Sequence, residues 1–428
     1  MSGQAERRVV VTGIGLVTAL GEGVEDTWQA LLAGRTAIGP LRSYDPSPLD
    51  TRIGAEITGF DPARFVARRS LRMVGRGDQF AVAAATLALR DAGLEDDAEL
   101  GCRAGLFLGG AKEMPRMDDL VANLATVRDA DGTVDLPRLG ESAASLIAPL
   151  FFVEGLQPAA LFHVSQKFGI RGPNAFFAGT ADSGATAIGR AARAIRRGEA
   201  DLAVAGGYDE ATSWWSMSKM DGLGVLSTRN ELGAGAFRPF DKEHSGSVFG
   251  EGAALLVLED RDRALARDAR CYAELTGFGG GSDGVRPPTP DPRAKGLTRA
   301  ITYALRDARR TPRIDYVAAH GCATPRGDVS ETRALHDALG EDAGSVQVSS
   351  VKPQTGHLVG GAGALNVAVA ALALDTGFVP ATANHEHPAA GCDLDYIPGS
   401  ARESRPAAAL ALARGLEGQA AALVLAKA

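Results

Sequence analysis

The sequence predicts an α/β fold, because short apolar strands alternate with amphipathic helices along the chain. Residues 9–12, 104–108 and 202–205 are apolar runs with the length of buried strands. Between them, residues 76–92 and 183–197 place apolar side chains at approximately helical spacing. Regular alternation of this kind is typical of layered α/β proteins.

The remaining elements continue the same alternation. A glycine-rich loop is expected after the first strand, and glycines close several of the helices. The further elements are, in order, a helix over 24–33, strands over 253–258 and 272–277, a helix over 298–309, a strand over 316–319 and a small-residue helix over 360–374. Residues 129–137 and 286–293 are predicted to be surface excursions.

The length of the chain indicates more than one packed unit. A chain of 428 residues, 45% of them hydrophobic, is too long for one compact core. The charged stretch at 260–270 separates two parts of similar pattern. We therefore expect an N-terminal half over residues 1–262 and a C-terminal half over residues 263–428.

Charge and cysteine content exclude several classes of function. The net charge is −7 and there is no long basic run, which argues against nucleic acid or an anionic membrane as the main partner. We find no apolar run of the roughly 18 residues that a membrane span needs. The four cysteines have no metal-type spacing and suggest no disulfide framework. A reducing, cytoplasmic location is expected.

Two motifs suggest a cofactor or a metal, but each lacks a feature that such a site requires. Gly279, Gly281 and Gly284 have the spacing of a dinucleotide fingerprint, but Pro287 and Pro288 follow, where a helix should begin. His385 and His387 precede Pro388 and have no third ligand at a sensible spacing, which favours a solvated loop. We expect neither a cofactor nor a metal site.

The strongest chemical signal is a pair of histidines with a lysine. His320 directly follows the strand at 316–319, and His357 precedes the small-residue helix with Lys352 five residues before it. Imidazole N–H groups at such junctions can stabilise an enolate as CO2 leaves a malonyl thioester, without a nucleophile from the protein. The alternative is that both histidines are structural.

Many short motifs make the chain resemble the β-ketoacyl synthases of the thiolase superfamily, over essentially its whole length. The resemblance implies a thiolase-like, duplicated five-layer α-β-α-β-α fold, a dimer, and substrates carried by an acyl carrier protein on its phosphopantetheine arm. The matching segments are 9–15, 172–174, 203–207, 226–230, 238–241, 250–253, His320-Gly321 with Thr324 and Asp328, 352–358 and 391–395.

The most informative feature is a departure from that family. Its nucleophilic cysteine lies in a Thr-Ala-Cys-x-Ser-Gly turn at a helix N-terminus, where the helix dipole lowers the pKa of the thiol. Here the turn contains Ala181 at the cysteine position, counted from either flank, and a one-residue shift would place Asp182 there. Neither residue can form an acyl thioester. Cys322 and Ser183 are the only candidate substitutes, and neither fits well.

Other positions also differ from the family pattern. Leu416 stands in the loop that gates the acyl pocket, where the family has phenylalanine, and Asn366 replaces a glutamate. Phe162, next to Leu161, adds bulk that could narrow an acyl tunnel near the expected dimer interface, although a packing role is as plausible. Thr324 keeps its family identity and is expected to contact substrate.

Two functions remain open. The chain could be a non-elongating subunit, similar to a chain-length factor of a type II polyketide or fatty-acid synthase, paired with a cysteine-bearing ketosynthase as a heterodimer. It could instead form a homodimer and act as a malonyl-carrier-protein decarboxylase, or another cysteine-independent acyl-processing enzyme, through His320, His357 and Lys352. The loss of the cysteine favours the subunit, whereas the retained histidines favour the enzyme.

Overall fold

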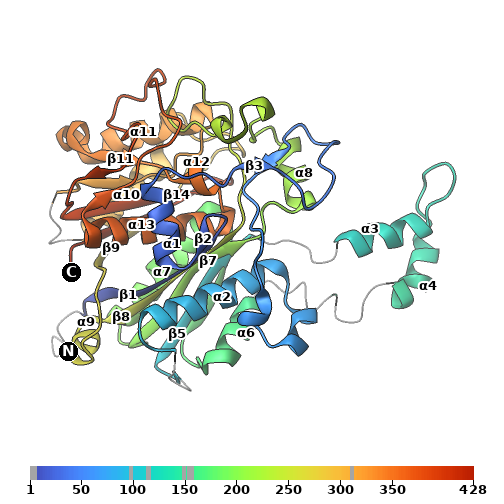
Figure 1. Cartoon of the computed structure of the whole chain (residues 1–428), viewed down its shortest axis with the longest axis horizontal. Coiled ribbons are helices and arrows are strands. Elements are labelled where there is room, and N and C mark those ends of the chain that lie inside the picture. The colour runs from blue at the N-terminus through green and yellow to red at the C-terminus, as the bar shows by residue number, and fades with distance from the viewer. Residues whose placement is uncertain (1–6, 96–99, 112–116, 147–150, 152–158, 309–312) are drawn as a thin grey trace.

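The computed structural model describes residues 7–95, 100–111, 117–146, 151, 159–308 and 313–428. Within these ranges the chain builds one large mixed sheet (Figure 1). In spatial order its strands are β11 (Gln347–Ser349), β10 (Tyr316–Ala318), β14 (Ala408–Arg414), β15 (Gln419–Ala426), β9 (Ala273–Ser282), β1 (Val9–Thr18), β8 (Gly252–Asp260), β7 (Leu202–Asp209), β5 (Ala104–Gly110) and β6 (Asn174–Ala178), with β2 (Gly21–Glu22) beside β1.

The helices cover both faces of this sheet, and small two-stranded pairs lie outside it. The pairs are β3 (Gly39–Pro40) with β4 (Ile53–Gly54) and β12 (Phe378–Val379) with β13 (Arg402–Glu403). The helices are α1 (Val24–Leu32), α2 (Arg76–Asp91), α3 (Met117–Thr126), α4 (Leu136–Leu146), α6 (Ala159–Phe168), α7 (Ala181–Arg196), α8 (Trp214–Gly222), α9 (Arg261–Ala266), α10 (Lys295–Asp307), α11 (Pro325–Leu339), α12 (Lys352–Thr355) and α13 (Ala362–Thr376).

The elements form five layers, as predicted. Helices α7 and α13 pack against each other and contact both β7 and β8 on one side and β14 and β15 on the other, so they make the middle layer. Helix α2 covers the outer face of β1, β7 and β8. Helix α10 covers the outer face of β9 and β15. The predicted α/β class with five α-β-α-β-α layers is therefore confirmed.

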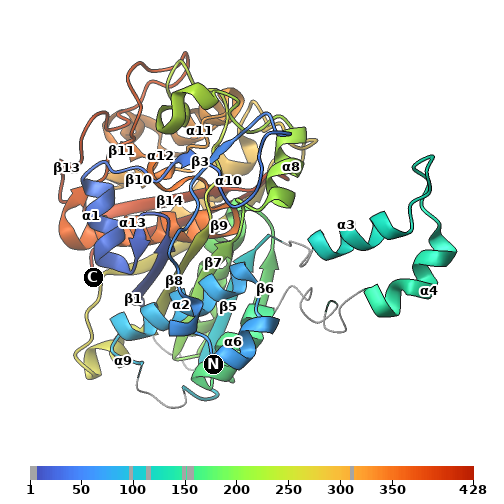
Figure 2. The ribbon, with the colours of Figure 1, turned by 45° about the vertical axis from the view of Figure 1, so that its right-hand side comes forward.

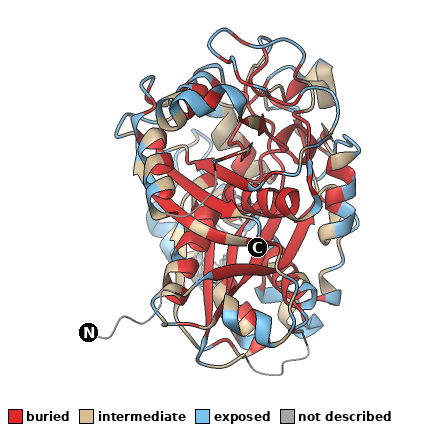
Figure 3. Ribbon diagram, turned by 90° about the vertical axis from the view of Figure 1, so that its left-hand side faces the viewer, coloured by how far each residue is buried: buried red, intermediate tan, exposed pale blue. Residues whose placement is uncertain are grey.

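Most of the sheet strands and the middle layer are buried, and the exposed residues lie mainly on the outer helices and loops (Figure 3). By length and composition, Val359–Thr376 could cross a membrane, contrary to the expectation that no apolar run is long enough, but 89% of this stretch is buried inside the fold. Because α13 is surrounded by protein, its hydrophobicity is explained by its place in the core.

Glycines set how closely the layers approach. The first strand extends through Thr18, and the glycine-rich loop expected after residue 12 is part of it. A Cβ on Gly13 or Gly15 would lie 2.2 Å or 1.9 Å from the backbone oxygens of α2. These glycines therefore allow helix α2 to pack directly on the strand.

One pair of helices lies apart from the rest. In Figures 1 and 2, α3 and α4 project from the body of the molecule as a hairpin. The turn between them, predicted as a surface excursion, is exposed and is held by the Asp129 N–H bonded to the Thr133 carbonyl at 2.8 Å.

Candidate active site

A pocket of about 90 Å³ lies where the N-terminus of α7 meets the ends of β10 and β14. It brings together six candidate residues singled out in the sequence: Ala181, His320, Cys322, Thr324, His357 and Leu416. Its full lining is Thr180, Ala181, Met220, Val225, Ser247, Phe249, Asp283, Pro288, Thr289, Pro290, His320, Cys322, Thr324, His357, Val359, Arg414, Gly415, Leu416 and Gly418.

Ala181 is the first residue of α7 and is buried against this pocket. The helix begins two residues earlier than the sequence predicted. Thr180, just before it, accepts a hydrogen bond from the Leu416 N–H at 2.7 Å and donates one to Glu417 Oε2 at 3.2 Å. This bridge holds the loop at 415–418 against the start of the helix.

His320 is fixed by backbone and carboxylate contacts. Its N–H and that of Gly321 donate to the two oxygens of Glu331, at 2.7 Å and 2.8 Å. Its ring Nδ1 accepts from the backbone N–H of Arg414 at 3.4 Å. An Nδ1 that accepts places the proton of the neutral ring on Nε2.

His357 has the same tautomer for a similar reason. Its Nδ1 accepts from the Val359 N–H at 3.0 Å, so its Nε2 is also a donor when the ring is neutral. The His320 and His357 ring centroids lie 5.5 Å apart at an interplanar angle of 81°. The imidazole rings of His320 and His357 therefore bring two N–H donors to one small cavity.

The environment keeps both rings uncharged. Burial is the main reason that the pKa values of His320 and His357 lie well below the usual value of a histidine, and the nearby Lys352 ammonium lowers both further. Both rings are consequently neutral hydrogen-bond donors at physiological pH.

Lys352, on α12, is buried and is not part of the pocket lining. Its Nζ is buried and has no hydrogen-bond partner among the described residues. Burial lowers the pKa of Lys352 to about 8, while the negative charge of Glu331 opposes that shift. At neutral pH the amine stays largely protonated and supplies positive potential next to both histidines.

Cys322 lies in the pocket but is not activated. Its Sγ is 3.1 Å from Thr324 Oγ1, and burial together with the charge of Asp328 raises the pKa of this thiol. A thiol with a raised pKa is a poor nucleophile at neutral pH. Ser183, the other candidate to replace the cysteine, donates its hydroxyl to the Thr180 carbonyl. Phe162 lies outside the pocket.

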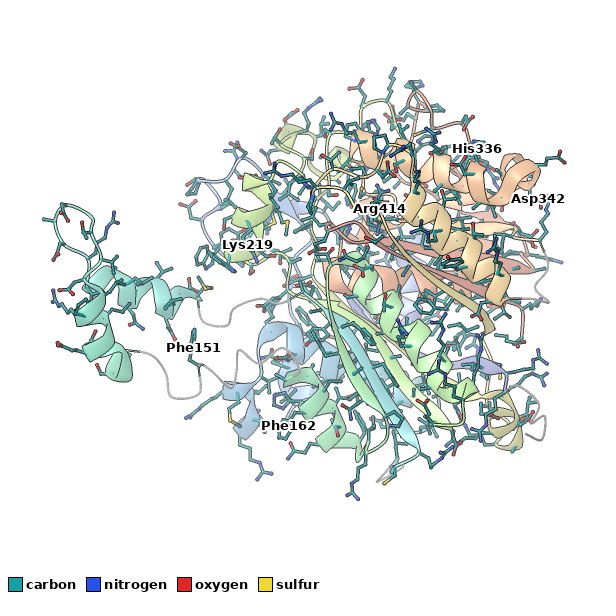
Figure 4. All side chains as sticks on the ribbon, turned by 180° about the vertical axis from the view of Figure 1, so that it is seen from behind. Phe151, Phe162, Lys219, His336, Asp342 and Arg414 are labelled. Carbon is teal, nitrogen blue, oxygen red and sulfur yellow. The ribbon has the colours of Figure 1, made fainter. Side chains whose placement is uncertain are left out.

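Phe162 lies on the surface of α6, and 60% of it is exposed (Figure 4). With Leu161 it lines a separate hollow next to the edge strand β6. The structure thus brings the predicted residues of the pocket together and leaves Phe162 apart from them.

Several residues of the site were not expected from the sequence. Pro288, Thr289 and Pro290 line the pocket, so the segment predicted to be a plain surface excursion belongs to the site. Arg414 also lines it, and its only sequence signal is a charged residue at the end of an apolar run. Asn366, at the position where a glutamate was expected, lies outside the pocket lining and donates from Nδ2 to the carbonyls of Ala319 and Leu412, at 2.9 Å and 2.8 Å.

This fold agrees with the comparison with known proteins. Residues 6–264 match the N-terminal domain of the β-ketoacyl synthases, and residues 272–386 match their C-terminal domain. The chain belongs to the β-ketoacyl synthase family.

Particular relatives cover nearly the whole chain. It is 38% identical over 392 residues to 3-oxoacyl-[acyl-carrier-protein] synthase 2 of Coxiella burnetii, covering 91% of each chain. It is 36% identical to the ketoacyl synthase alpha subunit of the tetracenomycin polyketide synthase of Streptomyces glaucescens, covering 100% and 99%. Among solved structures, the ishigamide ketosynthase/chain length factor superposes with a TM-score of 0.88 at 30% identity, covering 99% and 100%.

Proposed function

We propose that this chain is a non-elongating ketosynthase-like subunit that acts with a cysteine-bearing ketosynthase, in the manner of a chain-length factor, in a type II polyketide or fatty-acid synthase. The observation that carries the proposal is Ala181, a methyl group at the first residue of α7 in the same pocket as His320 and His357. Without a nucleophile there, the chain cannot take up an acyl group as a thioester.

An exposed edge of the sheet supports the pairing. Strand β6 ends the sheet, and its residues are only partly buried, Phe176 and Phe177 among them. An edge strand with unpaired N–H and C=O groups and apolar side chains is suited to pair with another chain. Phe162 projects from the neighbouring helix α6 and would extend that contact.

The carrier and substrate follow from the family. The Coxiella burnetii relative is named for an acyl-carrier protein, and we propose that a carrier protein also delivers acyl groups to this chain on its phosphopantetheine arm. The pocket that ends at Ala181 would receive the thioester.

The proposal is tested by co-expression with a candidate cysteine-bearing ketosynthase. We expect a stable heterodimer whose products change in chain length when Phe162→Ala is introduced. Phe378→Ala, an exposed phenylalanine on β12, is the matched control and should leave the products unchanged. A pair that never forms, or products insensitive to Phe162, would count against the proposal.

A second candidate is favoured by the two neutral histidines. Decarboxylation of a malonyl thioester breaks the bond between its α-carbon and the carboxylate, which leaves as CO2, and the electron pair moves into an enolate. The Nε2–H groups of His320 and His357 could donate to the enolate oxygen, and a solvent proton then completes the acetyl group. No cysteine is required for these steps.

Release of CO2 separates the two candidates. The isolated chain is incubated with malonyl-carrier protein, and His320→Ala is compared with His336→Ala, an exposed histidine paired with Asp393. CO2 release that is lost in His320→Ala and kept in His336→Ala would establish decarboxylase activity. No release from the isolated chain would leave the subunit as its sole role.

A further inference from the structure

Arg414 is a buried cation with no use in the chemistry described so far. It is the last residue of β14 and is only 7% exposed, yet it lines the pocket (Figure 4). A buried guanidinium is costly unless its charge and its N–H groups are satisfied.

The protein satisfies this guanidinium only in part. Its Nη1 donates to Ser330 Oγ at 3.1 Å, and within the described residues no carboxylate lies within ion-pair distance of it. Each side-chain nitrogen of Arg414 either has a hydrogen-bond partner or is accessible to solvent. The N–H groups that Ser330 leaves free therefore reach the cavity.

The nearest buried carboxylates are already engaged elsewhere. Glu331 accepts from the N–H groups of His320 and Gly321, and it balances Arg414 only through the longer-range field. Asp328 accepts from the N–H groups of Phe240 and Ala323 and from His244. Each carboxylate has its own partners, so neither explains why the cavity wall carries an arginine.

Asp283 is the other charged residue of the lining. One of its oxygens accepts from the Asp291 N–H at 3.2 Å, and it does not pair with Arg414. The cavity wall thus carries a planar cation that has no direct carboxylate partner among the described residues, in the same lining as Ala181 and the two histidines. A carboxylate is the group that such a fork of donors binds best, through two parallel hydrogen bonds.

We propose that Arg414 makes this pocket selective for acyl thioesters whose acyl chain ends in a free carboxylate. The guanidinium binds that carboxylate, and Ser330 orients the guanidinium from behind. The inference rests on the proposed function only in taking a pantetheine-linked acyl group as the occupant of the pocket. It holds whether or not the chain pairs with a ketosynthase.

The test is binding of two matched probes to the isolated chain by calorimetry. Succinyl-pantetheine carries the carboxylate, and succinamyl-pantetheine replaces it with a neutral amide of nearly the same shape. We expect the wild-type protein to bind the succinyl probe about 10- to 100-fold more tightly, as for a charged hydrogen-bonded pair. This comparison needs no variant and no partner subunit.

Variants then assign the preference to Arg414. Arg414→Met should abolish the preference, Arg414→Lys should retain part of it, and Ser330→Ala should reduce it. Arg405→Met, at an arginine exposed far from the pocket lining, is the control and should keep the preference. Equal binding of the two probes, no binding of either, or a preference that survives in a folded Arg414→Met protein would overturn the inference. Failure to form a heterodimer would bear on the proposed function alone.

Discussion

At the scale of single residues, the pocket combines the methyl group of Ala181 at the start of α7 with two imidazole hydrogen-bond donors. Ala181 offers only a methyl group, while the Nδ1 atoms of His320 and His357 accept backbone N–H groups and so leave both Nε2 atoms as donors. Burial lowers the pKa values of both rings, and the positive charge of Lys352 lowers them further because it disfavours a second positive charge nearby.

Replacing Lys352 should therefore raise the pKa values of both histidines. In Lys352→Met the neighbouring positive charge is gone, so the protonated imidazoles become less unfavourable, although burial still holds both pKa values below the usual value. Histidine ring-proton shifts followed by NMR across pH 4–8 measure this directly. Lys295→Met, at an exposed lysine at the start of α10, should leave both titrations unchanged. A fall in either pKa would contradict this electrostatic account.

At the scale of elements, the middle layer positions the turn that contains Ala181. Helix α7 can approach β7 and the segment before α13 because glycines face each other there: a Cβ on Gly207 would lie 2.2 Å from the Gly360 carbonyl oxygen and 2.8 Å from the Gly184 Cα. Backbone atoms at such distances cannot move aside cheaply. The pocket therefore depends on packing that tolerates no side chain.

Gly207→Ala should destabilise the protein by about 1–3 kcal/mol, because the added methyl group forces the layers apart. Chemical denaturation measures the change. Gly344→Ala is the matched control, since a Cβ at Gly344 meets nothing within 4 Å, and its stability should match the wild type. Equal stability of the two variants would show that the glycine contact does not set the spacing of the layers.

Some of these elements and site residues could be predicted from the sequence, and others could not. Periodicity located the strands β1, β5, β7, β8, β9 and β10 and the helices α1, α2, α7, α10 and α13, but it missed β6, β11, β14, β15 and α11. The motifs around His320, His357 and Ala181 predicted residues that do meet in one pocket. Periodicity could not show that the glycines after residue 12 lie within a strand, because that depends on the packing of α2. Nor could it place Arg414 or Pro288 in the pocket, since long-range strand order brings them there.

At the scale of the whole molecule, the surface features suit a protein that works with others. The edge strand β6 and the exposed Phe162 lie together on one side of the sheet, and the helical hairpin of α3 and α4 projects from the body (Figure 2). We propose the side of the molecule around β6 as the pairing surface. Within such a pair, the two subunits would divide the work, one carrying the acyl group and this chain shaping or processing it.

The division of labour is tested most directly by the intact mass of each subunit after incubation with an acyl-carrier protein substrate. We predict an acyl adduct on the cysteine-bearing partner and none on this chain, alone or in the pair, because Ala181 cannot form a thioester and the Cys322 thiol has a raised pKa. Ala181→Cys, which restores a thiol at the start of α7, serves as the positive control and should gain the adduct. An acyl adduct on the wild-type chain would contradict the account.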